Sequence, residues 1–341
     1  KLPIIETQQL SKSFKVHTNS PANSLTGRIR RLFRDARTEI RALDSVSFKV
    51  ERGEAVAYLG PNGAGKSTTI KLLCGILTPS VGTACVLGYT PWKERKSLVR
   101  HIGVVFGQRS QLLWDLPVKE SFRFLATIYG LSKAEQHTNT RFISDLMDLD
   151  ELLNKPVREL SLGQRVRCEV GAALLHQPEI LLLDEPTIGL DLLVKDRVRE
   201  GLRYLRKELG VTILLASHDF GDVEAICDRA ILINNGLLRY DGGLEKLRSL
   251  TGPARTIEFT LEQSTPNLEF GLNGSPEVEC EVTEDNKLII KFDSSKVTAQ
   301  KIIAAVTSSN GVTDFKIIEP RLEDAVRELY INHDPKELLK A

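Results

Sequence analysis

Paired cysteines are the first feature that this sequence of 341 residues lacks. Its five cysteines are scattered along the chain and include no C-x-x-C pair: Cys74, Cys85, Cys168, Cys227 and Cys280. This spacing fits neither a structural zinc site nor a disulfide framework. We therefore expect a protein of a reducing, cytosolic compartment.

Long apolar runs and an excess of charge of one sign are also missing. Apolar stretches such as Ile180–Leu183 and Val211–Ala216 are far too short to span a bilayer, which takes about 20 residues in a helix. If the protein serves a membrane, we expect it to do so through a partner. The 46 basic and 45 acidic residues nearly cancel, so the overall charge gives no argument for a nucleic-acid partner.

The chain does contain two different textures. Up to about residue 248, short apolar strands such as "EILLLDEP", "VTILLAS" and "RAILINNG" alternate with helices, which is typical of a parallel sheet covered on both faces. Residues 109–165 are mainly helical. From residue 249 the strands alternate apolar and polar residues, as in "TIEFTL", "VECEV" and "KLIIKF", and a few helical segments join them. We predict an α/β domain over 1–248 and a small α+β domain over 249–341.

A glycine-rich loop, "GPNGAGKST", follows the strand "AVAYL" and precedes a helix that starts near Ser67. It matches G-x-x-x-x-G-K-[ST], whose backbone N–H groups converge on phosphate oxygens at a helix N-terminus. Lys66 is placed to reach the outer phosphates, and the Ser67 hydroxyl to coordinate Mg²⁺. The loop predicts a nucleoside triphosphate site formed by Gly60, Pro61, Asn62, Gly63, Ala64, Gly65, Lys66, Ser67 and Thr68.

A pair of acids ends the apolar strand "ILLLDEPT" about 120 residues further on. Ligands of parallel sheets bind at the carboxyl ends of the strands, so we expect both side chains near the phosphate loop. Asp184 suits an outer-sphere role on Mg²⁺, through water. Glu185 is placed to orient an attacking water or to accept its proton.

With "ELSLGQR" as a third element, the chain resembles the nucleotide-binding subunit of an ABC transporter over about residues 4–245. "LSLGQ" is similar to the family's LSGGQ signature loop, with Leu162 in place of the first glycine. The resemblance implies a P-loop ATPase fold with a mixed-sheet core, an antiparallel β-subdomain and a helical subdomain. It also implies that two subunits sandwich each ATP, so that the signature loop serves the phosphate loop of the other subunit through Ser161, Gly163 and Gln164.

Other residues match single elements of the family. Gln108 resembles the glutamine that senses Mg²⁺ and the attacking water. Gln111 competes for that role, but the interval to the following "LPV" favours Gln108. Asp191 looks like the aspartate that communicates between the two ATP sites, and His218 like the switch histidine at the γ-phosphate. Phe14 is placed like the aromatic residue that stacks on adenine, although a core position is equally open for it.

The resemblance implies hydrolysis of ATP by in-line attack of water. Lys66, His218 and Mg²⁺ would stabilise the negative charge, and Glu185 would activate the water. The stretches "VVFGQRSQLLWDLPVKESF" and "IIEPRLEDAVRELY" point further to the ABC-2 export branch. The family implies a second ATPase subunit, either an identical copy, which we expect, or a paralogue. It also implies transmembrane permease subunits and a peripheral place on the cytoplasmic face of the inner membrane.

Two other functions are less well supported. A soluble ABC ATPase that acts on ribosomes or DNA is an alternative, but such proteins usually carry two cassettes or a long coiled coil. This chain has one phosphate loop, one signature and no heptad run. A subunit that binds ATP without hydrolysing it disagrees with the intact Lys66, Asp184, Glu185 and His218.

One basic segment has no match among these motifs. Apolar residues recur at helical spacing from Leu25 to Ile40, and we predict a basic helix over residues 25–41 within an insertion at 17–41. Contact with anionic lipid headgroups or with an acidic permease surface is one interpretation. A solvated helix face is an equally good one. The opposite face carries six arginines, namely Arg28, Arg30, Arg31, Arg34, Arg37 and Arg41.

Overall fold

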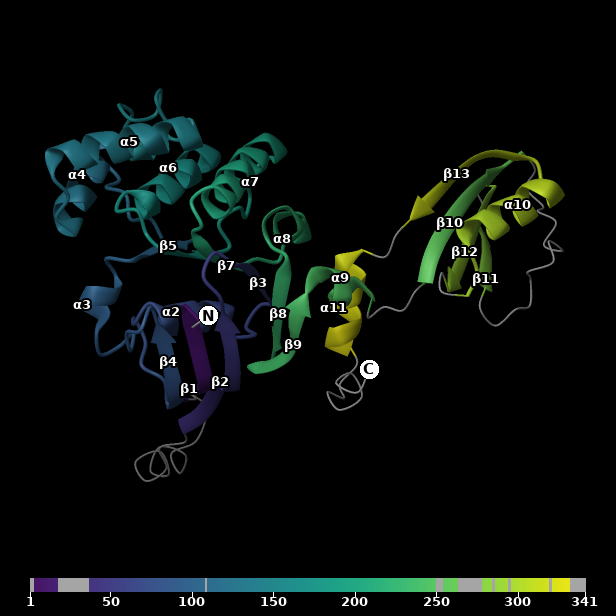
Figure 1. The fold of residues 1–341 in the computed structure, drawn as a ribbon, viewed down its shortest axis with the longest axis horizontal. Helices are drawn as coiled ribbons and strands as arrows, with labels where there is room; N and C mark the ends of the chain where they lie inside the picture. Colours follow the sequence, from purple (N-terminus) through teal and green to yellow (C-terminus); the bar gives the residue numbers. More distant parts are fainter. Residues whose placement is uncertain are drawn as a thin grey trace, which may run out of the picture. The chain divides into compact units, whose positions relative to one another are not determined.

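The computed structural model describes residues 3–17, 37–107, 109–249, 254–262, 278–283, 286–293, 296–318 and 321–331 (Figure 1). The chain divides into two compact units, residues 1–242 and 243–341. The sequence-based division after residue 248 differs from this by one short helix, α9 (Leu244–Ser249). This helix contacts α11 (Leu322–Ile331) of the second unit, which explains why it groups with that unit.

The first unit begins with an antiparallel sheet of order β2-β1-β4. It consists of β1 (Ile5–His17), β2 (Arg37–Val50) and β4 (Val81–Val86). Alternate residues of β2 are buried from Val46 to Val50, which is the period of a strand with one face on the core. This sheet is the antiparallel β-subdomain that the resemblance implied.

The helix predicted over residues 25–41 is wrong at its C-terminal end. Residues 37–41 belong to β2, where Thr38, Glu39 and Ile40 lie opposite residues 16, 15 and 14 of β1. Thr38 and Ile40 are β-branched, and backbone pairing with β1 outweighs the helical spacing of the apolar residues. His17, the start of the predicted insertion, is the last residue of β1. Residues 18–36 lie outside the described residues.

The core of the first unit is a six-stranded sheet of order β5-β6-β7-β3-β8-β9. Its first five strands are parallel. Asn235 and Gly236, both with positive φ, make the tight turn from β8 to β9, as in a hairpin. The residues of β3, β6 and β7 are all buried. The strands are β3 (Ala55–Leu59), β5 (Ile102–Phe106), β6 (Ile180–Asp184), β7 (Thr212–Ala216), β8 (Arg229–Asn234) and β9 (Leu237–Gly243).

Three helices, α4, α5 and α6, contact one another and form a group beside this sheet (Figure 1). α5 and α6 pack closely at Gly171, where a Cβ would lie 2.7 Å from the Cγ2 of Ile143. Among its described residues, the first unit contains the helices α2 (Lys66–Leu73), α3 (Arg95–Leu98), α4 (Val118–Tyr129), α5 (Lys133–Met147), the 3₁₀ helix η1 (Val157–Glu159), α6 (Leu162–Leu174), α7 (Leu192–Lys207) and α8 (Phe220–Ile226).

The second unit contains an antiparallel sheet of order β11-β12-β10-β13. Its strands are β10 (Ala254–Leu261), β11 (Val278–Thr283), β12 (Lys287–Asp293) and β13 (Val312–Ile318), and one helix is α10 (Ala299–Ser309). Phe259, Ile290 and Phe292 of the sheet share a core with Ile302 and Val306 of α10. Across the described parts of both units, none of the helices has the length and apolar character needed to cross a membrane.

Candidate functional site

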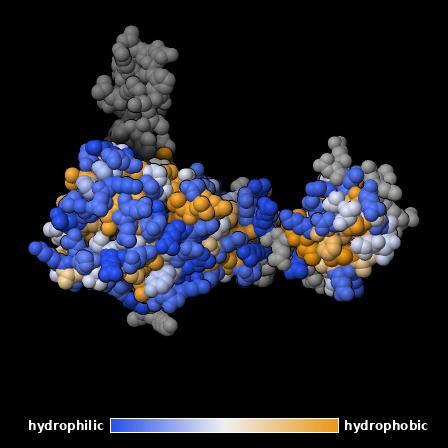
Figure 2. Space-filling view, turned by 90° about the horizontal axis from the view of Figure 1, so that it is seen from above, coloured by the Kyte–Doolittle hydropathy of each residue, from blue (hydrophilic) through white to orange (hydrophobic). Residues whose placement is uncertain are grey.

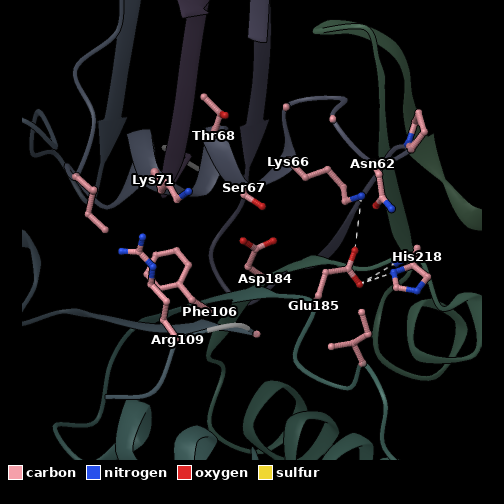
Figure 3. Close-up of a pocket in the computed structure, with 16 residues that line it drawn as sticks. Asn62, Lys66, Ser67, Thr68, Lys71, Phe106, Arg109, Asp184, Glu185 and His218 are labelled. Carbon is pink, nitrogen blue, oxygen red and sulfur yellow. Dashed lines mark hydrogen bonds and ion pairs between the residues drawn. The ribbon is translucent and has the colours of Figure 1, made fainter. Parts of the chain in front are cut away.

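A cavity of about 620 Å³ opens where β3 and β6 end (Figure 3). The predicted phosphate-loop residues Pro61, Asn62, Gly63, Gly65, Lys66, Ser67 and Thr68 line it, together with Asp184, Glu185 and His218. The parallel order of the sheet explains this meeting, because the carboxyl ends of β3, β6 and β7 lie at one edge. Gly60 and Ala64 belong to the same loop but do not line the cavity, and Ala64 is buried.

The path of the phosphate loop depends on glycine. Gly65 has a φ of 112°, and a Cβ there would lie 2.6 Å from the carbonyl oxygen of Ala42. No side chain caps the N-terminus of α2, so the first N–H groups of this helix face the loop without a side-chain acceptor. Such groups, together with the helix dipole, favour an anion at this point.

Lys66 is a buried cation at the centre of the cavity wall. Its Nζ donates a hydrogen bond to the Gly60 carbonyl oxygen at 2.6 Å and lies 3.6 Å from Oε1 of Glu185. Burial of an ammonium group is costly unless a partner compensates the charge. A phosphate entering the cavity offers stronger compensation than a single carboxylate, so Lys66 is poised to exchange one partner for the other.

Asp184 supplies an oxygen that no other group satisfies. The residue is 8% exposed, and its Oδ1 is buried without a hydrogen-bond partner among the described residues. Figure 3 shows the Asp184 carboxylate and the Ser67 hydroxyl facing each other across the cavity. One carboxylate and one hydroxyl, completed by phosphate oxygens and water, are a donor set that fits Mg²⁺.

Glu185 and His218 line the same cavity and form a hydrogen-bonded carboxylate–imidazole pair. The His218 Nδ1 lies 2.6 Å from Oε2 of Glu185, and the His218 backbone N–H also donates to this oxygen. Glu185 has a φ of 54°, in the left-handed region that non-glycine residues rarely adopt. Its own N–H donates to the Ala216 carbonyl oxygen at 2.8 Å, which holds this conformation. Strained backbone of this kind is characteristic of functional positions.

Gln108 and Gln111 are the two candidates for the glutamine that senses Mg²⁺. Gln108 lies outside the described residues, so its role stays a prediction. Its neighbour Gly107 is anchored beside the acids, because its N–H donates to the Asp184 carbonyl oxygen at 2.8 Å. Gln111 instead turns to α6, where its Nε2 donates to the Glu169 carbonyl oxygen at 3.1 Å. It does not line the cavity.

Phe14 lies outside the cavity on β1, opposite Ile40 of β2. Its ring is 37% exposed, and the Lys12 Nζ lies 5.3 Å from the ring centroid. The exposed ring is available for stacking, and Phe14 does not occupy a position in the hydrophobic core. Its contact with adenine stays a prediction.

The signature residues do not line the cavity of their own chain. Ser161 caps α6, because its Oγ accepts from the Gln164 N–H while Gln164 Oε1 accepts from the Ser161 N–H. Asp191 caps the neighbouring helix α7 in a similar way, accepting from the Val194 N–H at 3.0 Å. A Cβ at Gly163 would lie 3.0 Å from Val194, so the signature loop and the Asp191 loop are adjacent.

Three polar residues near the cavity escaped the sequence analysis. Lys71 and Arg109 line it, and Lys71 stands one helical turn after Thr68, a spacing that pointed to it. Glu169 is a buried acid in the apolar stretch "CEVGAAL" of α6, and burial raises the pKa of its carboxyl group. It accepts hydrogen bonds from the Ser110 hydroxyl and the Gln111 N–H, and thereby ties the segment after Gly107 to the signature helix.

Comparison with known proteins agrees with this geometry. Residues 43–188 match the family described as "ABC transporter". The ABC transporter ATP-binding protein NatA of Bacillus subtilis is 36% identical over 217 residues, which are 64% of this chain and 88% of NatA. The linearmycin resistance ATP-binding protein LnrL of the same species is 30% identical over 283 residues, which are 82% of this chain and 90% of LnrL.

A solved structure is also similar. It is cbiO1 from Clostridium perfringens, described as part of the ABC transporter complex cbiONQ. The two chains are 27% identical with a TM-score of 0.60, and the match covers 74% of this chain and 92% of cbiO1. The P-loop ATPase fold inferred from the motifs is thus confirmed. The chain belongs to the ABC transporter ATP-binding proteins and is an ABC-type ATPase.

Proposed function

We propose that this chain is the ATP-hydrolysing subunit of a membrane exporter of the ABC-2 type, that it works as a dimer, and that a separate permease carries the cargo. The observation that carries the proposal is the separation of two phosphate-binding elements within one chain. The cavity contains the loop Gly60–Thr68, whereas Ser161 presents its hydroxyl elsewhere, at the N-terminus of α6. A second copy brings the two elements together.

Within one cavity the residues have separable roles. The N–H groups of the loop and of the first turn of α2 bind the phosphates, and Lys66 exchanges Glu185 for the γ-phosphate. Ser67 and Asp184 would hold Mg²⁺, which would neutralise phosphate charge when bound. Glu185 orients the attacking water and accepts its proton, and His218 holds the Glu185 carboxylate in place until the γ-phosphate takes over its contacts.

An apolar surface surrounds the signature loop and supports the dimer. Large apolar side chains stand exposed beside Ser161 and Asp191, the most exposed being Leu193 at 81%. Exposed apolar groups that cluster around a functional loop indicate a protein interface. The members of this surface are Leu162, Ile188, Leu192 and Leu193.

A second hollow of about 240 Å³ supports a permease partner. It is lined by residues of α3, β5, α4 and α6, among them Arg95, Tyr129 and Glu169. It shares Phe106 and Arg109 with the nucleotide cavity, so an inserted segment of a permease would lie next to the ATP site. Phe124 and Ile128 of α4 are exposed as well. The relative cbiO1 is described as part of an ABC transporter complex, and LnrL is named for linearmycin resistance, which supports export.

The test of this function uses Glu185→Gln in the full chain. The amide keeps the size of the side chain but cannot accept a proton, so we expect ATP to be bound, hydrolysis to be nearly abolished, and a stable ATP-bound dimer to appear by size-exclusion chromatography. A variant that hydrolyses at the normal rate would remove Glu185 from its role. Affinity purification from native membranes then identifies the partner. Ribosomal or DNA partners in place of a membrane protein would favour the soluble alternative.

A further inference from the structure

Strand β13 of the second unit is an edge strand with a free side. It pairs with β10 and, among the described residues, with no other strand. A long edge strand presents a row of backbone N–H and C=O groups that can pair with another chain. Natural proteins usually block such an edge, so an open one needs an explanation.

The backbone of Phe315 points toward this free side. In the antiparallel ladder Phe315 lies opposite Phe259. The Leu261 N–H donates to the Asn286 carbonyl oxygen on the β12 side of β10, and the backbone of Phe259, two residues earlier, faces the same side and not β13. The Phe315 N–H donates to Oδ1 of Asp314 at 2.8 Å. Residues of an antiparallel strand alternate between pairs that exchange backbone hydrogen bonds and pairs that do not. Phe315 therefore belongs to the second kind, and its N–H and C=O both face outward.

The strand also exposes apolar side chains that belong to the core face. Ile317 and Phe315 lie opposite the buried Ile257 and Phe259, but they are 43% and 44% exposed. Figure 2 shows hydrophobic surface, in orange, on this unit. α10 covers the other strands of the sheet and leaves these two side chains open. Burying them against a partner is favourable, at about 25 cal/mol per Å² of apolar surface.

We propose that β13 pairs antiparallel with β13 of a second copy of this chain, centred on Phe315, so that the sheets of two second units join into one. In this register Phe315 meets the partner's Phe315, and Asp314 meets the partner's Lys316. The same pairing occurs twice because of the two-fold symmetry. By the alternation of a strand, Asp314 and Lys316 lie on the face opposite Phe315, and neither forms an ion pair among the described residues. In the paired state the Phe315 N–H would donate to the partner strand instead of to the Asp314 carboxylate, which would leave this carboxylate for the partner's Lys316.

The charge pattern favours a second copy over another partner. A cross-strand pair of opposite charges stabilises a sheet, and like charges directly opposite each other destabilise it. When two copies of Asp314-Phe315-Lys316 pair antiparallel, each acid lies opposite a lysine of the other copy. An unrelated strand need not offer these opposite charges at both positions. The pairing goes beyond the proposed function and depends on it in one respect: an ATP-bound dimer tethers two second units and raises their effective concentration.

Disulfide crosslinking in the full chain tests the pairing. In a backbone-paired antiparallel position the two Cα atoms are about 5.5 Å apart, within the range of a disulfide. Phe315→Cys is therefore expected to crosslink to itself under mild oxidation, in a background where Cys85 and Cys280 are serine. The remaining cysteines are buried, and burial raises their thiol pKa values, to about 11 for Cys74 and about 12 for Cys168.

Phe315→Cys also removes the Phe315 rings that the pairing would bury, so a variant that keeps these rings and a control at the other edge of the sheet complete the test. Asp314→Cys combined with Lys316→Cys retains Phe315 and is expected to crosslink as well. Glu279→Cys lies exposed on β11, the opposite edge of the same sheet, and is the matched control that should stay unlinked.

Charge exchange gives a second readout. Asp314→Lys alone is expected to slow the Phe315→Cys crosslink on the order of tenfold, because two like-charge pairs replace two opposite pairs. Adding Lys316→Asp restores the complement and should restore the rate. Loss of fold would not be rescued by a second charge change.

The nucleotide-free and ATP-bound arms separate this proposal from the proposed function. Crosslinking without nucleotide at high protein concentration tests the pairing of β13 without the ATP-bound dimer. Adding Glu185→Gln and ATP is expected to raise the rate of the crosslink. No crosslink in either arm, or an equal one at Glu279→Cys, overturns the pairing. The same holds if Phe315→Cys is protected from thiol reagents in the monomer, because then this chain covers its own edge. A crosslink at Phe315→Cys without any ATP-bound dimer counts against the proposed function only.

Discussion

Complementation between two inactive variants is the sharpest test of sites shared between subunits. Lys66→Ala removes the buried cation from the phosphate loop, and Ser161→Arg fills the signature loop with a bulky cation. If each ATP is enclosed by Lys66 of one subunit and Ser161 of the other, both homodimers lack every complete site. A mixed dimer has one complete site, made of the phosphate loop from the Ser161→Arg chain and the signature loop from the Lys66→Ala chain.

The expected magnitude follows from counting sites. Random assembly of an equal mixture puts about half of the subunits in mixed dimers, and each of these has one complete site out of two, so about one quarter of the wild-type ATPase activity should return. The fold should survive, because the described contacts of Ser161 within its own chain are those of the α6 cap, and loss of such a cap costs about 1 kcal/mol.

The assay is phosphate release from each variant and from their mixture after joint refolding or coexpression. Ser132→Arg is the matched control, because Ser132 caps α5 with the same two hydrogen bonds to Glu135 that Ser161 makes with Gln164. It should retain activity. Normal hydrolysis by Ser161→Arg alone would refute the shared site, and so would an inactive mixture in which tagged mixed dimers are demonstrably present.

Four further predictions concern single features. Gly65→Ala should abolish ATP binding in a fluorescent-nucleotide titration, because its φ of 112° and the nearby Ala42 carbonyl oxygen leave no room for a Cβ; unchanged affinity would show that the loop adjusts. Ser110→Ala should lower kcat with little change in ATP affinity, because it removes the hydrogen bond that ties the segment after Gly107 to Glu169. The control Ser144→Ala removes a similar hydrogen bond to Asp150 and should lower only the Tm. Burial lowers the pKa of His176 from 6.5 to about 4, so the full contribution of this residue to the free energy of unfolding is present above pH 6.5. On the order of 3 kcal/mol of this free energy should be lost as the pH falls to 4, and His176→Phe should flatten this part of the pH profile in urea titrations. If the basic segment binds lipid, its binding to anionic liposomes should weaken as the salt concentration rises, and it should disappear when Arg28, Arg30 and Arg31 are changed to glutamate. Unchanged binding of this variant would leave the interpretation as a solvated segment.

The sequence was most informative where local chemistry and chain order suffice. The phosphate loop and the acids at the end of β6 each depend on residues within a few positions of one another, and the structure has the loop between a strand and a helix and the acids at the end of a strand. The strands of the second unit were also predicted, because their apolar residues alternate with period two. The family resemblance added Asp191 and also His218, whose partner Glu185 is distant in sequence.

Only the tertiary structure decided how distant segments meet. Residues 37–41 have helical spacing but form a strand, because β1 offers them a backbone partner. Glu169 reads as one acid on a helix until the fold places Ser110 and Gln111 against it. The open edge of β13 is likewise invisible in the sequence, since strand order and the cover of α10 determine which apolar residues stay exposed. Local preferences act over a few residues, whereas burial and strand pairing depend on the whole chain. The sequence alone therefore determined which chemical groups the site contains, and the tertiary structure determined how these groups are arranged.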